Sequence, residues 1–121
     1  MIYTDNLADL IFDAHKKYPC DSVKFLGGWL GPSPVQKFSR NSIDTKIVYG
    51  CWQKANKKHH QSYVNITQNS RTDVLYADSY NHSKIYVWEK NNNPVYVLAG
   101  SANFSNNAIY SSQEEFLQKC T

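Results

Sequence analysis

The chain has 121 residues, of which 41% are hydrophobic and 19% charged, which excludes a disordered protein and favours one globular domain. A net charge of +3 permits an anionic partner without requiring one. No run of ~18 apolar residues is present, and acidic residues stand near the N-terminus where a signal peptide would be apolar. Three cysteines without CxxC spacing are typical of free thiols, so we expect a cytoplasmic protein that does not bind a membrane.

The predicted elements alternate between helices and strands. Apolar residues at helical spacing predict an N-terminal helix over 4–18. The later segments are a strand at 22–30, a short helix at 33–38, strands at 44–51, 72–77, 82–90 and 95–101, and a final helix at 111–119. Residues 52–70 are polar and basic, and their pattern does not decide between a loop and a helix. This order predicts an α/β fold with a mixed β-sheet flanked by helices, ending in an antiparallel hairpin.

The last predicted hairpin carries polar side chains where strands prefer apolar ones. A four-residue loop over 91–94 would place Lys84 opposite Ser101. The same register would place His82 opposite Asn103, and facing side chains lie ~4.5–5.5 Å apart. A loop one residue shorter or longer would move one pair to the other face. The alternative to a shared site is that the serine and asparagine cap a turn and the histidine begins a strand.

These side-chain types suit a tetrahedral phosphate. An imidazole can act as a nucleophile or as an acid–base group, and a lysine supplies a fixed positive charge. Serine and asparagine donate hydrogen bonds, and Gly100, which lacks a side chain, would let an oxyanion approach the backbone. No carboxylate cluster suited to magnesium accompanies them, and one histidine without a nearby thiolate is a poor zinc site. We therefore expect a phosphate site that uses neither a metal nor another cofactor.

The same residues carry a resemblance to a known family. The run His82-Ser83-Lys84, then Glu89, then the run Gly100-Ser101-Ala102-Asn103 resembles the HxK…D/E…GSxN signature of the phospholipase D superfamily. The strings HSKIYVWEK and VYVLAGSANFS are more similar to its nuclease branch, and within it to the NgoFVII group of restriction endonucleases, relatives of BfiI. The resemblance spans most of residues 22–118.

The acidic residues follow this family pattern with one departure. Glu89 replaces the family's usual aspartate, a largely structural position, so we expect no chemical role for it. Nuclease relatives carry a further glutamate after GSxN that orients the histidine. Glu114 and Glu115 both fit that position, and of the two we favour Glu115.

The resemblance implies a phospholipase D-like sandwich over residues 1–121, one domain of a longer protein. It also implies a metal-independent DNA phosphodiesterase in which His82 forms a phosphohistidine and Lys84, Ser101 and Asn103 stabilise the phosphate charge. Family active sites use two such motifs and this chain carries one, which implies a homodimer with the active site at the interface. The expected whole protein is a type II restriction endonuclease with a separate DNA-recognition domain.

The densest basic run supplies Lys54, Lys57 and Lys58 as candidate contacts to the DNA backbone, and the alternative is an ordinary solvated surface. Two other functions stay open. A phospholipase or phosphatidyltransferase of the same superfamily would carry two motifs and an apolar lipid-binding surface. A non-catalytic nucleic-acid-binding module would keep the motif without cleaving its ligand.

Overall fold

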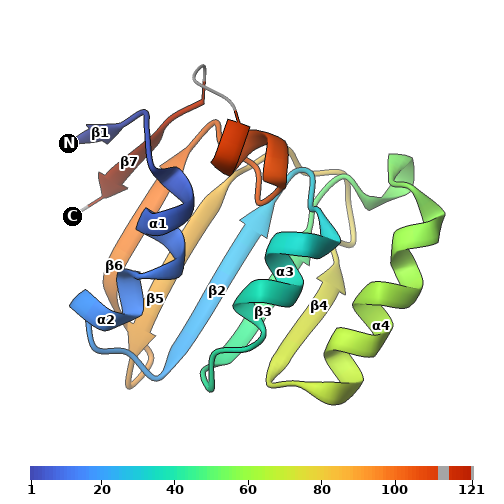
Figure 1. The fold of residues 1–121 in the computed structure, drawn as a ribbon, viewed down its shortest axis with the longest axis horizontal. Helices are drawn as coiled ribbons and strands as arrows, with labels where there is room; N and C mark the ends of the chain where they lie inside the picture. Colours follow the sequence, from blue (N-terminus) through green and yellow to red (C-terminus); the bar gives the residue numbers. More distant parts are fainter. Residues whose placement is uncertain (112–114, 121) are drawn as a thin grey trace.

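The computed structural model describes residues 1–111 and 115–120, and its centre is a seven-stranded mixed β-sheet (Figure 1). Across the sheet the strands follow the order β1-β7-β6-β5-β2-β3-β4. Their bounds are β1 Ile2–Tyr3, β2 Ser22–Gly27, β3 Asp44–Tyr49, β4 Thr72–Tyr76, β5 Ile85–Lys90, β6 Asn93–Gly100 and β7 Leu117–Cys120. Strands β2, β3 and β4 are parallel, and the other neighbouring pairs are antiparallel. The expected α/β fold with a mixed sheet is confirmed.

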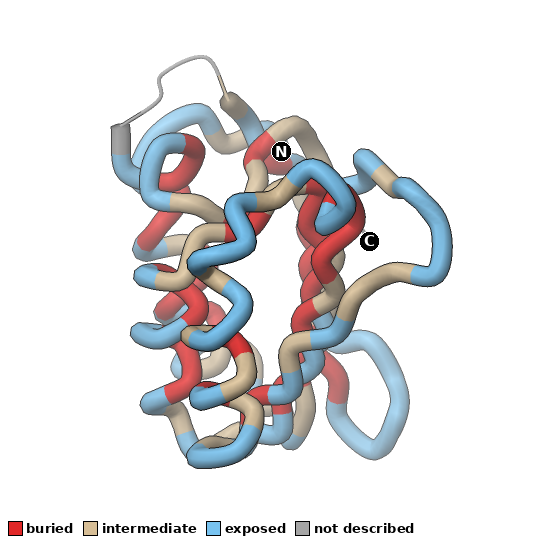
Figure 2. Tube along the Cα trace, turned by 90° about the vertical axis from the view of Figure 1, so that its right-hand side faces the viewer, coloured by how far each residue is buried: buried red, intermediate tan, exposed pale blue. Residues whose placement is uncertain are grey.

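The helices cover one face of this sheet (Figures 1 and 2). They are α1 Leu7–Phe12, α2 Ala14–Lys17, α3 Pro32–Phe38 and α4 His60–Asn69, with the 3-10 helices η1 Trp52–Lys54 and η2 Lys57–His59 and the π-helix η3 Asn107–Ser111. The single helix expected over 4–18 is therefore divided in two at Asp13. None of the helices described is long and apolar enough to cross a membrane.

Alternating side chains on the strands explain why the covered face forms the core. Val23 and Phe25 on β2 and Ile47 on β3 point toward the helices and are at most 1% exposed. The rings packed around Phe25, with centroids 4.9 to 5.3 Å away, belong to Phe38, Tyr86, Trp88 and Phe104. Fully burying one such side chain contributes about 1.5–3 kcal/mol, so this aromatic cluster anchors α3, through Phe38, on the sheet.

The opposite face of the sheet carries a mixture of charged and apolar side chains. Leu75 on β4, Ile85 on β5 and Val95 on β6 are exposed there. The ammonium group of Lys24 lies 3.0 Å from a carboxylate oxygen of Glu89. Glu89 therefore has an ionic partner at the turn end of β5, away from the polar residues that precede this strand.

The hairpin between β5 and β6 has a two-residue turn instead of the expected four-residue loop. Asn91 and Asn92 have φ angles of 52° and 64°, a left-handed conformation that a two-residue hairpin turn uses and that asparagine tolerates. Lys90 therefore pairs with Asn93, and a bulge further along β5 shifts the register again.

This turn makes the predicted register of the polar residues wrong. His82 precedes β5, so it does not face Asn103 across the hairpin. The backbone oxygen of Lys84 accepts a hydrogen bond from Gly100 N–H at 3.2 Å, so Lys84 does not face Ser101 either. Strand pairing thus does not bring the four side chains together, and a different arrangement must do so.

Residues 117–120 form a strand, β7, where we expected the last part of a helix over 111–119; residues 112–114 of that predicted helix lie outside the described residues. This strand pairs with β6 on one side and with β1 on the other. A Cβ on Gly100 would collide with the carbonyl oxygen of Phe116 and lie 3.0 Å from the Cα of Leu117, so glycine allows β7 to approach. Hydrogen bonds to two strands that are distant in sequence outweigh the local helical pattern.

Candidate active site

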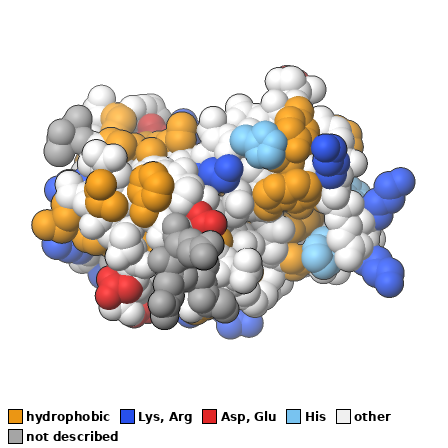
Figure 3. Space-filling view, turned by 90° about the horizontal axis from the view of Figure 1, so that it is seen from above, with side chains coloured by type: hydrophobic (Ala, Val, Ile, Leu, Met, Phe, Trp, Pro, Cys, Tyr) orange, Lys and Arg blue, Asp and Glu red, His pale blue; other side chains and the backbone are white. Residues whose placement is uncertain are grey.

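The candidate site lies at the edge of the sheet where the parallel strands end. Gly27, the last residue of β2, and the following Gly28 accept hydrogen bonds from the N–H groups of Gly50 and Cys51, both at 2.8 Å. These bonds join β2 and β3 beyond their last ladder pair. Open α/β sheets collect functional side chains at the carboxyl ends of their strands. Seen from above, this edge carries a histidine among hydrophobic and basic side chains (Figure 3).

The segment before β5 is held against the end of β3. Asn81 N–H donates to the Gly50 carbonyl at 3.0 Å, and the Cys51 thiol donates to the Asn81 carbonyl at 3.3 Å. The side-chain oxygen of Asn81 accepts the N–H of Ser83 at 2.8 Å. These contacts fix the backbone on both sides of His82, whose side chain is exposed.

His82 and Asn103 meet at Gly28. A Cβ on Gly28 would lie 3.2 Å from Asn103 Oδ1 and 3.3 Å from both the Cα and the carbonyl oxygen of His82. Asn103 Oδ1 accepts the backbone N–H of Trp29 at 2.9 Å, which leaves its Nδ2 to donate elsewhere. The two halves of the predicted motif therefore lie side by side, although not as facing residues of a hairpin.

Ser101 holds the segment that carries Glu115. Its N–H donates to the Phe116 carbonyl and its Oγ accepts the Phe116 N–H, each at 3.0 Å. The Tyr86 hydroxyl donates to the Ala102 carbonyl at 2.6 Å. Burial and, second, the negative charge of Glu115 raise the pKa of Tyr86.

The structure corrects the role expected for Gly100. Its N–H is bonded to the Lys84 carbonyl, and the carbonyl oxygen of Phe116 fills the position that a Cβ would take. Gly100 thus makes room for β7 and not for an oxyanion. Lys84 itself is half-buried and directly precedes β5. Glu114 lies outside the described residues, so the choice between it and Glu115 stays open.

Tyr80, which the sequence motif does not include, lies directly against His82. Their ring centroids are 4.6 Å apart, with the planes at 77°. The ammonium group of Lys54 lies 5.4 Å from the centroid of the Tyr80 ring, in a cation–π contact. Tyr80 therefore connects the histidine with the beginning of the basic run. Its only signal in the sequence is its position two residues before His82.

The rest of the basic run belongs to the next helix in the chain. Lys57 and Lys58 belong to η2 and are exposed. In the described part of the chain, no cluster of three or more His, Cys, Asp or Glu side chains could hold a metal ion. A reaction without a metal stays a prediction, because the arrangement of these residues does not test it.

Comparison with known proteins identifies the family. A family model described as the NgoFVII restriction endonuclease N-terminal PLD domain, where PLD is phospholipase D, matches residues 5–121. The chain belongs to this family. The predicted membership in the nuclease branch of the phospholipase D superfamily is therefore confirmed, and the NgoFVII-type domain is an endonuclease domain.

A solved structure supports the fold of this NgoFVII-type domain. NucT from Helicobacter pylori superposes with a TM-score of 0.67 at 18% sequence identity, covering 98% of this chain and 82% of that chain. At this identity the likeness concerns the fold, and it agrees with the mixed sheet and its helices. No curated protein matches the chain.

Proposed function

We propose that this NgoFVII-type domain hydrolyses DNA phosphodiester bonds without a metal ion, through a phosphohistidine on His82. The observation that carries the proposal is the contact of His82 and Asn103 with Gly28, because it supports a single site built from both halves of the motif. An exposed imidazole can reach a phosphate, and Asn103 Nδ2 can donate to its oxygens. Family membership favours a nuclease over a phospholipase or a purely binding module.

The proposed reaction has two displacements at phosphorus. In the first, a ring nitrogen of His82 forms a bond to phosphorus while the bond to the leaving oxygen breaks. That oxygen takes a proton from His82 of a second copy. In the second, the same residue of the second copy removes a proton from water, whose oxygen displaces the first imidazole. Lys84, Ser101 and Asn103 stabilise the charge that develops on the phosphate oxygens.

Glu115 is the proposed positioning residue for His82. A carboxylate that accepts one ring N–H determines which ring nitrogen is free to attack. The two hydrogen bonds between Ser101 and Phe116 support this role, because they hold the backbone directly after Glu115.

The proposed active unit is a homodimer, because the mechanism uses two imidazoles and the chain carries one motif. Exposed apolar side chains lie next to the motif in the chain: Ile85 follows Lys84 and Phe116 follows Glu115, each 38% exposed, and Tyr80, which packs against His82, is 44% exposed. Burying these side chains between two copies would bring both His82 residues to one phosphate. A type II restriction activity would further require a recognition domain, since base readout needs more surface than one modest basic run provides.

The test is cleavage of plasmid DNA in the presence of EDTA. We expect cleavage to persist in the chelator, and we expect its rate to fall by about 10²- to 10⁴-fold in His82→Ala. His15→Ala, on α2 at the other end of the sheet (Figure 1), is the matched control and should keep its activity. Activity that EDTA abolishes and a divalent metal restores would contradict the scheme. Release of head group from phosphatidylcholine without DNA cleavage would instead favour the phospholipase alternative.

A further inference from the structure

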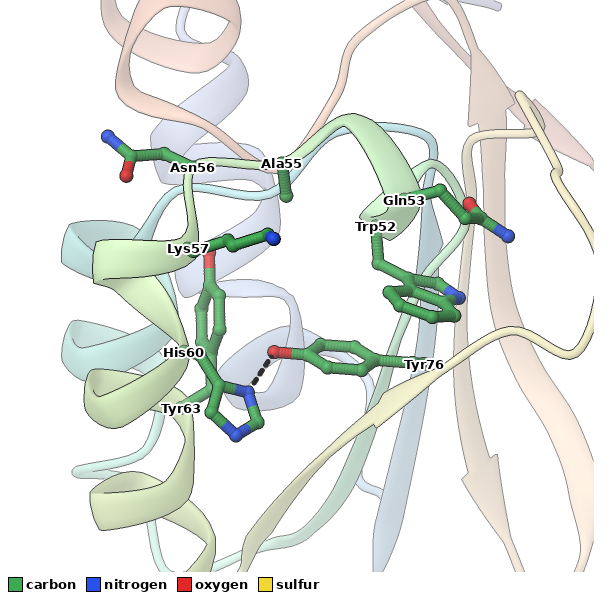
Figure 4. Close-up of a pocket in the computed structure, with 8 residues that line it drawn as sticks. All are labelled: Trp52, Gln53, Ala55, Asn56, Lys57, His60, Tyr63 and Tyr76. Atoms are coloured by element: carbon green, nitrogen blue, oxygen red, sulfur yellow. Dashed lines mark hydrogen bonds between the residues drawn. The ribbon is translucent and has the colours of Figure 1, made fainter.

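A cavity of about 350 Å³ opens between η1, α4 and β4 (Figure 4). Its lining residues are Trp52, Gln53, Ala55, Asn56, Lys57, His60, Tyr63 and Tyr76. The volume falls at the small end of the roughly 300–1,000 Å³ that small-molecule sites occupy. None of these residues belongs to the sequence motif or takes part in the proposed mechanism. Lys57 is the one that the sequence also suggested as a contact to the DNA backbone.

Hydrogen bonds hold the aromatic side chains of the cavity in fixed positions. Trp52 stacks on Tyr76, with centroids 5.2 Å apart and planes at 10°. The indole N–H of Trp52 donates to the Ala77 carbonyl at 2.7 Å, and the Tyr76 hydroxyl lies 2.6 Å from Nδ1 of His60. Rings that are fixed before binding lose little conformational freedom when a flat ligand packs against them.

Tyr63 brings a polar group without a partner to the same cavity. Its side chain is 3% exposed, and its hydroxyl has no hydrogen-bond partner in the part of the chain that the structure describes. A buried hydroxyl in this state is destabilising, so its presence points to a ligand that completes the bond. Burial also raises the pKa of Tyr63, which keeps the hydroxyl neutral and able to donate or accept. Figure 4 shows this hydroxyl beside Lys57, across the cavity from Trp52.

The cavity and the candidate catalytic residue are joined by a short series of contacts. Trp52 and Lys54 belong to the same turn of helix, η1. The ammonium group of Lys54 lies over the ring of Tyr80, and that ring packs edge-on against His82. An anionic strand with a phosphate at His82 would therefore pass a lysine before it reaches Trp52.

We propose that this cavity binds one unpaired nucleobase of the strand whose phosphate lies at His82. A nucleobase is flat, stacks on aromatic rings and presents donors and acceptors along its edge, which match Trp52 and the Tyr63 hydroxyl. A base inside a duplex is stacked on both sides and cannot enter the cavity. The substrate base must therefore be single-stranded or turned out of the helix. This inference rests on the proposed nuclease function and adds a specificity site to it.

The test is an NMR titration of the chain with deoxyadenosine monophosphate. We expect shifts centred on the Trp52 indole N–H, and much weaker binding of deoxyribose phosphate, which lacks the base. Trp52→Ala should weaken nucleotide binding by about 5- to 100-fold. Tyr63→Phe should weaken it by a few-fold while the protein stays folded. Tyr110→Ala removes an exposed aromatic ring on η3 and is the matched control, with unchanged binding.

Two outcomes would overturn the inference. Equal binding of deoxyribose phosphate and nucleotide would show that only the phosphate is recognised. Binding of choline phosphate in place of the nucleotide would identify the aromatic side chains as a quaternary-ammonium site. The titration does not depend on cleavage. Nucleotide binding by a chain that never cuts DNA would contradict the proposed function alone, and cleavage without nucleobase binding would contradict this inference alone.

Discussion

Gly50 at the end of β3 and Asn81 before β5 are in direct backbone contact, with Asn81 N–H donating to the Gly50 carbonyl at 3.0 Å. The Asn81 carbonyl lies where a side chain at position 50 would begin. Because His82 follows Asn81, the position of the candidate nucleophile depends on the missing side chain of Gly50.

Gly50→Ala should therefore displace the loop that carries His82. A methyl group there would collide with the Asn81 carbonyl, and we expect cleavage to fall by about 10²-fold, as for a misplaced catalytic group. Gly31→Ala is the matched control, because its methyl would lie 3.5 Å from the nearest atom, the Cα of Ser105. Single-turnover cleavage and urea unfolding of both variants check the prediction. Full activity in Gly50→Ala would show that the loop position does not matter.

The motif could be predicted from the sequence, but its geometry could not. The residue types and spacing of His82 and Asn103 identified the family, which the family match over residues 5–121 confirms, and the phosphate site that they indicate stays a prediction. The hairpin register depended on left-handed backbone at Asn91 and Asn92 and on a bulge, and a one-residue difference there moves side chains to the other face. The contact through Gly28 depends on three segments that are distant in sequence, which periodicity does not reveal.

The C-terminal element was mispredicted for a related reason. Residues 111–119 have a locally helical pattern, yet β7 gains hydrogen bonds from β6 and β1. Most strands, in contrast, were predicted within a few residues, because alternation on β2 and β3 is set by the core they cover. The aromatic cavity could not be predicted, because its rings come from η1, α4 and β4, which are separate in sequence. Trp52 by itself is typical of a core or turn residue.

Glu115→Gln should lower the turnover number while the KM for DNA stays nearly unchanged. The amide cannot replace the charge of a carboxylate that positions His82, so we expect a loss of about 10- to 10³-fold. Glu89→Gln is the control, because Glu89 pairs with Lys24 near the turn of the hairpin. Steady-state kinetics and the urea midpoint separate the two roles. Equal losses in both variants would argue for a general structural effect.

Stability should fall as the pH rises above about 10. Burial raises the pKa of Tyr63, Tyr86 and Tyr96, whereas tyrosines of an unfolded chain titrate near their ordinary value of about 10. Above that pH the unfolded chain releases protons that the folded chain retains. The free energy of unfolding then decreases by up to about 1.4 kcal/mol per pH unit for each tyrosine. Below about pH 10 these tyrosines are protonated in both states and contribute no pH dependence.

Two variants separate the pH dependence of stability from the stability that a tyrosine hydroxyl contributes through its hydrogen bond. Tyr86→Phe leaves the Ala102 carbonyl without its donor and should cost about 1–3 kcal/mol at neutral pH. Tyr63→Phe removes a hydroxyl without a partner among the described residues and should be neutral or stabilising. Both should reduce the slope above pH 10. Urea unfolding across pH 7 to 11 measures both quantities, and an unchanged slope in either variant would count against its assignment.

Ile85→Asp should separate the proposed homodimer. Ile85 is 38% exposed at the end of β5 that lies next to the motif, so a charge there would be buried if two copies meet at this end of the sheet. Val95→Asp, at a side chain 40% exposed near the hairpin turn, is the matched control. Sedimentation should give about twice 13.9 kDa for the wild type and the control, and 13.9 kDa with no cleavage for Ile85→Asp. A fully active wild-type monomer would refute the shared site.

The most direct measurement is the capture of a covalent intermediate on His82 during turnover. The chain is mixed with an oligonucleotide radiolabelled at every phosphate, quenched in alkali, in which phosphohistidine is stable, and digested for peptide mapping. We predict label on the peptide that contains His82, which is lost on acid treatment and absent from His82→Ala. Rapid cleavage with no labelled peptide, or label that persists in His82→Ala, would contradict it.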